Sequence, residues 1–101
     1  MADVTSRLER NTQVTTSDDW EKRRPRLESL IKPLLEKQAG FKGIDIQWSD
    51  GRLVEITSWD SEENCRNYIR NGGAATVATY ADQAVPTAAY PNGTWVRSNS
   101  F

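Results

Sequence analysis

The stretch GIDIQWSDGRLVEITSW, residues 43–59, sets the centre of the fold. The apolar side chains of its first half occupy alternate positions and so share one face of an extended strand: Ile44, Ile46 and Trp48. Asp50-Gly51 then favours a tight turn, because two-residue hairpin turns need residues that tolerate a positive φ. Residues 52–59 supply the returning strand. The stretch therefore predicts a β-hairpin.

The segment after this hairpin has the signals of a helix. Asp60 or Ser61 offers an N-cap, and Glu62 and Glu63 place negative charge in the first turn, where it suits the helix dipole. We expect the helix to continue through Arg70.

Beyond that helix, Asn-Gly-Gly at residues 71–73 predicts a break. The alanine-rich residues 74–82 predict a further short helix, and residues 86–91, bounded by two prolines, a loop. Residues 94–101 supply a last strand, on which the following side chains share one face: Trp95, Arg97, Asn99 and Phe101.

Before the hairpin we expect a long amphipathic helix. Ser17 or Asp18 offers its N-cap, and Glu21 completes a capping-box pattern with Asp18. An apolar stripe follows at helical spacing: Leu27, Leu30, Ile31, Leu34 and Leu35. Because Pro25 and Pro33 interrupt the hydrogen-bond ladder, a short turn up to residue 24 and a kinked main helix ending near residue 40 are predicted.

Residues 3–10 alternate weakly and predict a first strand, with one side formed by Val4, Ser6, Leu8 and Arg10. The order βαββαβ indicates an α+β fold, a single ferredoxin-like sandwich over residues 1–101 with both helices on one sheet face. Apolar residues are expected on both faces of the hairpin, with Val54 and Ile56 opposite Leu53 and Trp59. The uncovered face would expose side chains among Trp48, Trp59 and Trp95, so we expect a homodimer that closes a dimeric α/β barrel.

The charge balance excludes several kinds of partner. Thirteen Lys and Arg residues against fourteen Asp and Glu residues give a net charge of -1, which offers no broad field for nucleic acid. No stretch approaches the length of a transmembrane span, and the first residues lack the apolar core of a signal peptide, so a cytoplasmic protein is expected.

The chain contains no histidine and a single cysteine, Cys65. This composition rules out Cys-His and Ser-His-Asp nucleophiles, an internal disulfide, and zinc or haem held by histidine. The scattered carboxylates suggest no metal site, and Cys65 is expected to be a small buried apolar residue of the second helix. We therefore expect chemistry without a bound cofactor.

Three segments resemble the antibiotic biosynthesis monooxygenase family of dimeric α/β barrels: AGFKG at 39–43, TSWDSEE at 57–63 and YIRNGG at 68–73. The likeness covers roughly residues 18–73. It implies a homodimeric barrel with a pocket between sheet and helices. The family's cofactor-free oxygenases act on aromatic, polyketide-like phenols and anthrones, while similar barrels include haem degraders, cyclases, isomerases and members with no assigned chemistry.

The resemblance places Trp59 at the pocket, where the family's oxygenases carry a tryptophan. Four residues earlier, where those oxygenases carry asparagine, this chain has Glu55. A spacing of four in a strand puts both side chains on one face. If Glu55 faces an apolar pocket, desolvation raises its pKa and makes it a general base, whereas on a strand edge it would be a solvated carboxylate. Trp59 is either a pocket wall or a core aromatic.

Further aromatic and basic residues complete the candidate site. Tyr68, on the helix after the junction, could orient a phenol or carbonyl oxygen or simply pack in the core. Tyr80 and Tyr90 flank a segment that could act as a lid or be a surface loop. Arg97 could bind a carboxylate or enolate or form a cross-strand ion pair, and Trp48 and Trp95 are candidate substrate-binding aromatics.

Two classes of function stay open. The first is a cofactor-independent enzyme, either a monooxygenase of aromatic or polyketide-type natural product biosynthesis or a cyclase or isomerase that uses the same base. The second is a non-catalytic dimeric ligand-binding or structural protein, because the family's asparagine and histidine are both missing.

Overall fold

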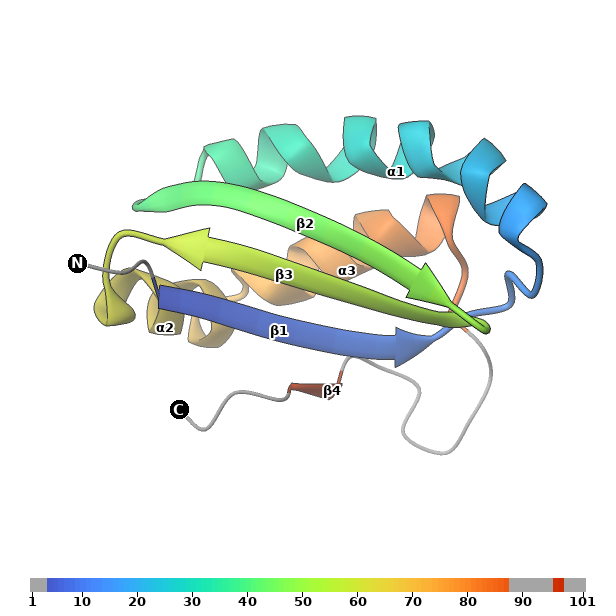
Figure 1. Cartoon of the computed structure of the whole chain (residues 1–101). Coiled ribbons are helices and arrows are strands. Elements are labelled where there is room, and N and C mark those ends of the chain that lie inside the picture. Colours follow the sequence, from blue (N-terminus) through green and yellow to red (C-terminus); the bar gives the residue numbers. More distant parts are fainter. Residues whose placement is uncertain (1–3, 88–95, 98–101) are drawn as a thin grey trace.

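The chain folds into an antiparallel β-sheet with helices packed on one of its faces (Figure 1). The computed structural model describes residues 4–87 and 96–97. In chain order their elements are β1 (Val4–Asn11), α1 (Ser17–Glu36), β2 (Phe41–Ser49), β3 (Arg52–Trp59), α2 (Glu62–Arg70), α3 (Gly73–Ala84) and β4 (Val96–Arg97). This α+β ferredoxin-like arrangement confirms the predicted fold class.

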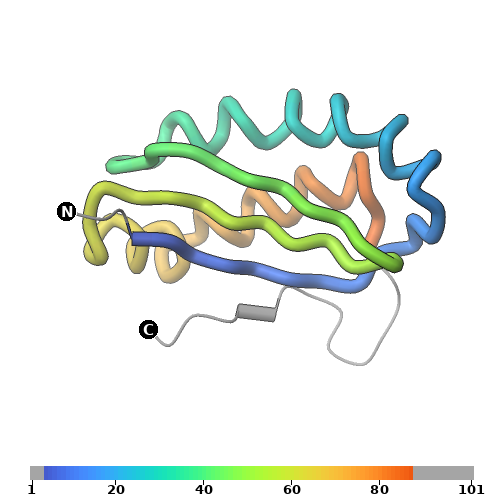
Figure 2. The backbone as a smooth tube through the Cα atoms, viewed as in Figure 1, coloured from blue at the N-terminus to red at the C-terminus, as the bar shows by residue number. Residues whose placement is uncertain are grey.

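The strands follow the order β2-β3-β1-β4, so β3 is an inner strand between β1 and β2 (Figure 2). The predicted hairpin is confirmed, because β2 and β3 pair antiparallel up to Ser49 opposite Arg52. At its turn Asp50 and Gly51 have φ values of 50° and 82°, the left-handed conformation that such turns require. β4 pairs with β1 through residues 96–97, and the rest of the strand predicted over 94–101 lies outside the described residues.

Helix α1 corrects the predicted boundaries. Its N-cap is Thr16 in place of the expected Ser17 or Asp18, because the Thr16 side chain accepts a hydrogen bond from the Asp19 amide. It then runs without a break through Pro25 and Pro33 to Glu36. Both prolines face solvent, where water can satisfy the carbonyls that lose a partner. The buried stripe on the other side holds the helix together: Trp20, Leu27, Ile31 and Leu35.

The second half of the chain follows the sequence-based expectation more closely. Ser61 caps α2 by accepting a hydrogen bond from the Asn64 amide. Gly72, at a φ of 89°, separates α2 from α3, and α3 extends slightly further in both directions than the predicted residues 74–82.

The turn between α1 and β2 meets the junction between β3 and α2 at Gly40. The Gly40 carbonyl accepts a hydrogen bond from the Asp60 amide at 2.9 Å. Gly40 has a φ of 79°, and a Cβ there would come closer than 3.0 Å to the side chains of Asp60 and Asn64. Only glycine combines this conformation with this approach, which gives the AGFKG segment a structural role beside the strand-to-helix junction.

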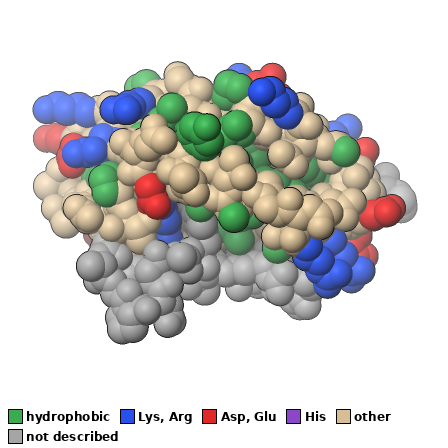
Figure 3. All heavy atoms as spheres, turned by 180° about the vertical axis from the view of Figure 1, so that it is seen from behind, with side chains coloured by type: hydrophobic (Ala, Val, Ile, Leu, Met, Phe, Trp, Pro, Cys, Tyr) green, Lys and Arg blue, Asp and Glu red, His purple; other side chains and the backbone are tan. Residues whose placement is uncertain are grey.

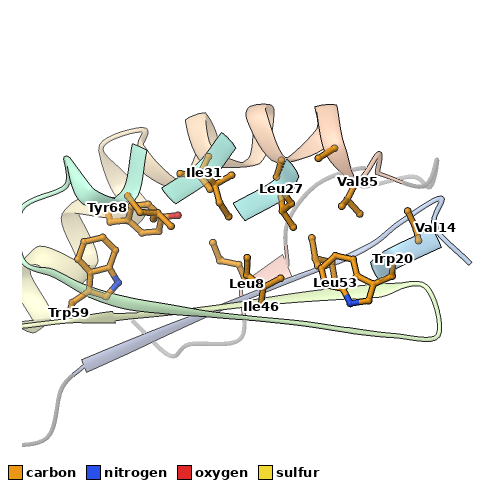
Figure 4. Close-up of a cluster of buried hydrophobic side chains, with 14 of the residues drawn as sticks. Leu8, Val14, Trp20, Leu27, Ile31, Ile46, Leu53, Trp59, Tyr68 and Val85 are labelled. Carbon is orange, nitrogen blue, oxygen red and sulfur yellow. The ribbon is translucent and has the colours of Figure 1, made fainter. Parts of the chain in front are cut away.

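The core lies between the sheet and the helices (Figure 4). Trp59 and Tyr68 occupy one end of it, and Trp20 and Val14 the other. Between them, sheet residues such as Leu8, Ile46 and Leu53 face the helical residues Leu27 and Ile31. All these side chains are almost fully buried, so the helices cover the middle of this sheet face, while Ile44 and Trp48 on the edge strand β2 stay partly exposed.

The other face of the sheet is more polar than the sequence suggested. Alternation along β3 directs Val54 and Ile56 to this face, where Glu9 forms ion pairs with Arg7 at 3.2 Å and with Arg52 at 3.3 Å. The expectation that the uncovered face would expose Trp48 or Trp59 is wrong, because the strand register places both on the helix-covered face. Trp95 lies outside the described residues.

Figure 3 shows the side opposite to Figure 1, on which α2 and α3 lie nearer the viewer. Apolar atoms there are interspersed with polar ones, and Lys and Arg side chains stand toward the margins. Of the helices within residues 4–87, none is long and apolar enough to cross a membrane.

Candidate active site

Trp59 is the last residue of β3 and is fully buried. Its ring lies 4.7 Å from that of Tyr68 and 5.7 Å from that of Phe41, measured between centroids. Its Nε1 donates a hydrogen bond of 2.9 Å to Thr57 Oγ1, so the polar edge of the indole is satisfied inside the protein. Trp59 is thus a core aromatic that also closes one end of the interior.

Glu55 lies on the same face of β3, 1% exposed, directly opposite Leu8 on β1 and Ile46 on β2. It is not an edge carboxylate, because β3 is an inner strand of the sheet and the helices cover its face. Tyr68 Oη donates a hydrogen bond of 3.2 Å to Glu55 Oε1. The structure therefore brings together three of the predicted residues: Glu55, Trp59 and Tyr68.

The surroundings of Glu55 set its protonation. Burial raises the pKa of Glu55 to about 7, although the hydrogen bond from Tyr68 and the charge of Arg10 act in the opposite direction. Burial and the neighbouring Glu55 both raise the pKa of Tyr68, so its hydroxyl stays protonated. At neutral pH the Glu55 carboxyl is close to half ionised, which is the condition that favours a general base.

Arg10 is a buried residue of this face to which the sequence analysis gave no role. It is 2% exposed. Its guanidinium donates to Thr87 Oγ1 and to the Val85 carbonyl, each at 2.6 Å, and forms an ion pair with Asp82. Arg10 thereby ties β1 to the end of α3 and supplies positive charge inside the protein. The alternation of residues 3–10 already put Arg10 beside Leu8, and that was the signal for its burial.

Two hydroxyl residues extend the polar part of the interior. Ser6 on β1 stands directly opposite Thr57 on β3, and both are at least 99% buried. Together with Glu55 and Tyr68 they form what we name the polar strip: Ser6, Glu55, Thr57 and Tyr68. Buried polar groups are costly unless they are paired, so their concentration beside Trp59 marks this region as the candidate site.

The remaining predicted residues lie elsewhere or outside the described residues. Trp48 stacks on Trp20 with centroids 6.4 Å apart, and its Nε1 donates to the Val14 carbonyl at 3.3 Å. Tyr80 on α3 is 40% exposed. The backbone of Arg97 pairs with Leu8, the residue opposite Glu55, whereas Tyr90 and Trp95 are outside the described ranges.

Other features of the described residues offer less chemistry. One surface hollow lies between α1 and β2 beside Arg24 and Asp45, and another on the outer sheet face beside Arg7 and Arg52, and neither is lined by the polar strip. Within residues 4–87 and 96–97, no three acidic or thiol side chains gather as a metal site requires. Cys65 is buried in α2, and burial raises the pKa of its thiol.

Comparisons with known proteins connect this geometry to a fold family. No family model matches the sequence, and no curated protein matches it. An antibiotic biosynthesis monooxygenase-type protein from Bordetella bronchiseptica is structurally similar, with a TM-score of 0.61 at 13% identity over 100% of this chain and 99% of that one. A similar protein from Nitrosomonas europaea gives a TM-score of 0.53 at 12% identity, covering 95% and 88%.

SnoaB, a cofactor-independent oxygenase from Streptomyces nogalater, is also similar, with a TM-score of 0.51 at 17% identity over 97% of this chain and 88% of SnoaB. The chain thus has the fold of antibiotic biosynthesis monooxygenase-type proteins, as the sequence resemblance implied. At such identities the likeness defines the fold, and the activity must be argued from the site.

Proposed function

We propose that the protein is a cofactor-independent monooxygenase that acts on an aromatic, polyketide-type small molecule. The observation that carries this proposal is the buried pair of Glu55 and Tyr68 beside Trp59. A carboxyl group with a pKa of about 7 and a phenol that stays protonated provide a base and a hydrogen-bond donor in one apolar enclosure.

In this mechanism the Glu55 carboxylate removes a proton from an activated C–H group of an anthrone-like substrate. The resulting carbanion, delocalised as an enolate, transfers its electrons to dioxygen and forms a peroxide anion, which takes the proton back from Glu55 and becomes a hydroperoxide. Glu55 then removes the second proton from the same carbon, the C=O bond forms as the O–O bond breaks, and the departing hydroxide takes that proton from Glu55 and leaves as water. The substrate supplies all the reducing electrons, and one oxygen atom of dioxygen stays in the product.

The position of each group supports this assignment. The Tyr68 hydroxyl donates its one hydrogen to the Glu55 carboxylate, and after Glu55 has taken the substrate proton this hydroxyl can turn to a developing enolate oxygen instead. Trp59 and Tyr68 offer ring faces for an aromatic substrate. Because the helices close the polar strip from solvent, substrate binding requires the helical layer to open, as lids do in many enzymes. The description of SnoaB as a cofactor-independent oxygenase agrees with this chemistry.

Two alternatives rest on specific observations. A cyclase or isomerase would use the same Glu55 base without oxygen, and the glutamate at the position where the family's oxygenases carry asparagine favours it. A non-catalytic dimeric protein would keep the barrel with a filled interior, and the complete burial of Trp59 favours that reading. The ionisable Glu55 inside the core is harder to explain for a purely structural domain.

The deciding experiment measures oxygen consumption and product formation with a panel of anthrones and phenols. The proposal expects turnover in air that stops under anaerobic conditions and fails with Glu55→Gln. Full turnover without oxygen would instead establish the cyclase or isomerase. No turnover of any panel member, with ligand binding retained, would favour the non-catalytic protein.

A further inference from the structure

Ser6 carries a buried hydroxyl that the fold leaves unexplained. Its Oγ is inaccessible to solvent and has no hydrogen-bond partner among the described residues. We propose that Ser6, together with Thr57, forms a subsite that hydrogen-bonds an oxygen of a phenolic or enolic ligand next to Glu55. This inference rests on the proposed function in one respect, namely that an aromatic ligand enters the interior at the polar strip.

The strand register places the subsite. Ser6 is the direct cross-strand neighbour of Thr57, so the Cβ atoms of the two residues are separated by about 4.5 to 5.5 Å. Both side chains are on the helix-covered face, as is Glu55 two residues before Thr57. Ser6 and Thr57 face one another without a hydrogen bond between their hydroxyls.

The bonding of Thr57 adds a second donor at the same place. Thr57 Oγ1 accepts the hydrogen bond from Trp59 Nε1 at 2.9 Å. An oxygen that accepts through one lone pair still has its own O–H to donate. Ser6 and Thr57 therefore present two hydroxyl donors from neighbouring strands, and a single ligand oxygen can accept from both.

The chemistry of the neighbours selects the kind of ligand. Glu55 at neutral pH repels a carboxylate or phosphate, because it carries partial negative charge in an apolar enclosure. A neutral phenol or enol avoids this repulsion and brings both a donor and an acceptor. In this arrangement the ring of the ligand packs against Trp59, and the ligand oxygen accepts hydrogen bonds from Ser6 and Thr57. The C–H group next to that oxygen then points toward Glu55.

A purely structural explanation is less satisfactory. Serine in an inner position of a buried strand contributes little packing, and an unpaired buried hydroxyl costs about 1 to 3 kcal/mol. An alanine at this position would avoid that cost. The hydroxyl at position 6 thus opposes stability in the described structure, which is typical of functional positions.

Ligand binding measured through the quenching of tryptophan fluorescence tests the proposal with 1-naphthol and naphthalene, which differ by one hydroxyl. For the unmodified protein we expect tighter binding of 1-naphthol. Ser6→Ala should reduce the affinity for 1-naphthol roughly 3- to 10-fold, the equivalent of one neutral hydrogen bond, and leave naphthalene unchanged. Ser58→Ala, on the neighbouring strand at the opposite sheet face, is the matched control and should change neither affinity.

Thermal unfolding separates this role from a structural one. Ser6→Ala should unfold at the same temperature or higher, because it removes an unpaired polar group. Ser6→Cys, which replaces the hydroxyl by a larger and much weaker donor, should show the same loss of naphthol preference. A clear fall in the unfolding temperature of Ser6→Ala would reveal a structural hydrogen bond and overturn the proposal. Equal affinities of the unmodified protein for both probes, or no binding of either, would also overturn it. Since the assay measures binding, it can succeed when Glu55→Gln retains turnover and the proposed base is wrong.

Discussion

Arg10 and Glu55 are diagonal neighbours on adjacent strands of the helix-covered sheet face, since Arg10 stands opposite Leu53, two residues before Glu55. The charge of Arg10 lowers the pKa that burial raises at Glu55. The guanidinium is held at the end of α3 through Val85, Thr87 and Asp82. Arg10 thus acts on Glu55 through its charge and not through a direct salt bridge. The pKa of the carboxyl therefore stays near 7, and the group is not held permanently in its ionised form.

The first prediction concerns catalysis. If Glu55 is the base, Glu55→Gln should lower turnover by about 10² to 10⁴ while preserving the fold, because glutamine has the same shape and cannot take the proton. The kcat/KM of the unmodified enzyme should rise with pH and level off above about pH 7. Asp45→Asn, on the exposed edge strand β2, is the control. Retained turnover of Glu55→Gln would refute the mechanism.

The same carboxyl predicts how stability depends on pH. Its pKa rises from an ordinary value of 4.5 to about 7 on folding, so the folded state binds a proton that the unfolded state has lost. The free energy of unfolding should fall as pH increases between about 4.5 and 7 and level off above, by about 3 kcal/mol in total from this group. Denaturant titrations at several pH values should show this fall, and Glu55→Gln should abolish it and be the more stable protein at pH 8.

Arg10→Met should reduce the free energy of unfolding by about 2 to 4 kcal/mol, because it removes charge-assisted hydrogen bonds and leaves the Val85 carbonyl unpaired. Loss of the positive charge should also raise the pKa of Glu55 further and move the pH–rate profile to higher pH. Arg24→Met, which breaks an exposed ion pair with Glu28 on α1, should cost less than about 1 kcal/mol. Equal effects of the two substitutions would contradict the role of Arg10.

Trp59 should matter more to stability than any other tryptophan of the described residues. Trp59→Ala should cost about 3 to 5 kcal/mol, since the ring is fully buried against Phe41 and Tyr68. Trp59→Phe should retain the fold and mainly weaken substrate binding through the smaller ring. Trp48→Ala, at a half-buried position, should cost less. Calorimetry of the three variants, combined with KM measurements for Trp59→Phe, tests this order.

Assembly gives the fifth prediction. We expect a homodimer that pairs the outer sheet faces and buries roughly 1,200 Å² or more, around Val54 and Ile56 and the ion-paired Arg7, Glu9 and Arg52. Light scattering at low micromolar concentration should give twice the chain mass of 11.4 kDa. Ile56→Asp should dissociate the dimer, because it buries a carboxylate among apolar side chains of the interface. Arg52→Ala should weaken the dimer, because it removes the ion pair with Glu9. A monomer under these conditions would refute the dimeric barrel.

The parts of the fold that the sequence predicted are the ones determined locally. The hairpin turn at Asp50-Gly51 and the cap at Ser61 depend on the conformational preferences of adjacent residues. The proximity of Glu55 to Trp59 follows in the same way from strand alternation.

The parts that it missed depend on contacts between distant segments. The burial of Arg10 requires the end of α3 to lie over β1, and the position of Ser6 opposite Thr57 requires the register of strands that are about fifty residues apart in sequence. The prolines of α1 were expected to separate a short turn up to residue 24 from a kinked main helix, whereas the structure has one helix in which both prolines face solvent.

Cys65 offers a way to measure the opening of the helical layer that the proposed substrate binding requires. Its thiol belongs to α2, a helix of that layer, and is buried in the core that the layer covers; the sequence has no second cysteine that would compete for a reagent. Alkylation of the native protein can therefore proceed no faster than the thiol becomes exposed. With the reagent in large excess, so that alkylation outpaces reclosing, its rate at different ligand concentrations measures how often α2 separates from the sheet. The opening of the helical layer can thus be measured on the unmodified chain, through its own cysteine and without an introduced label.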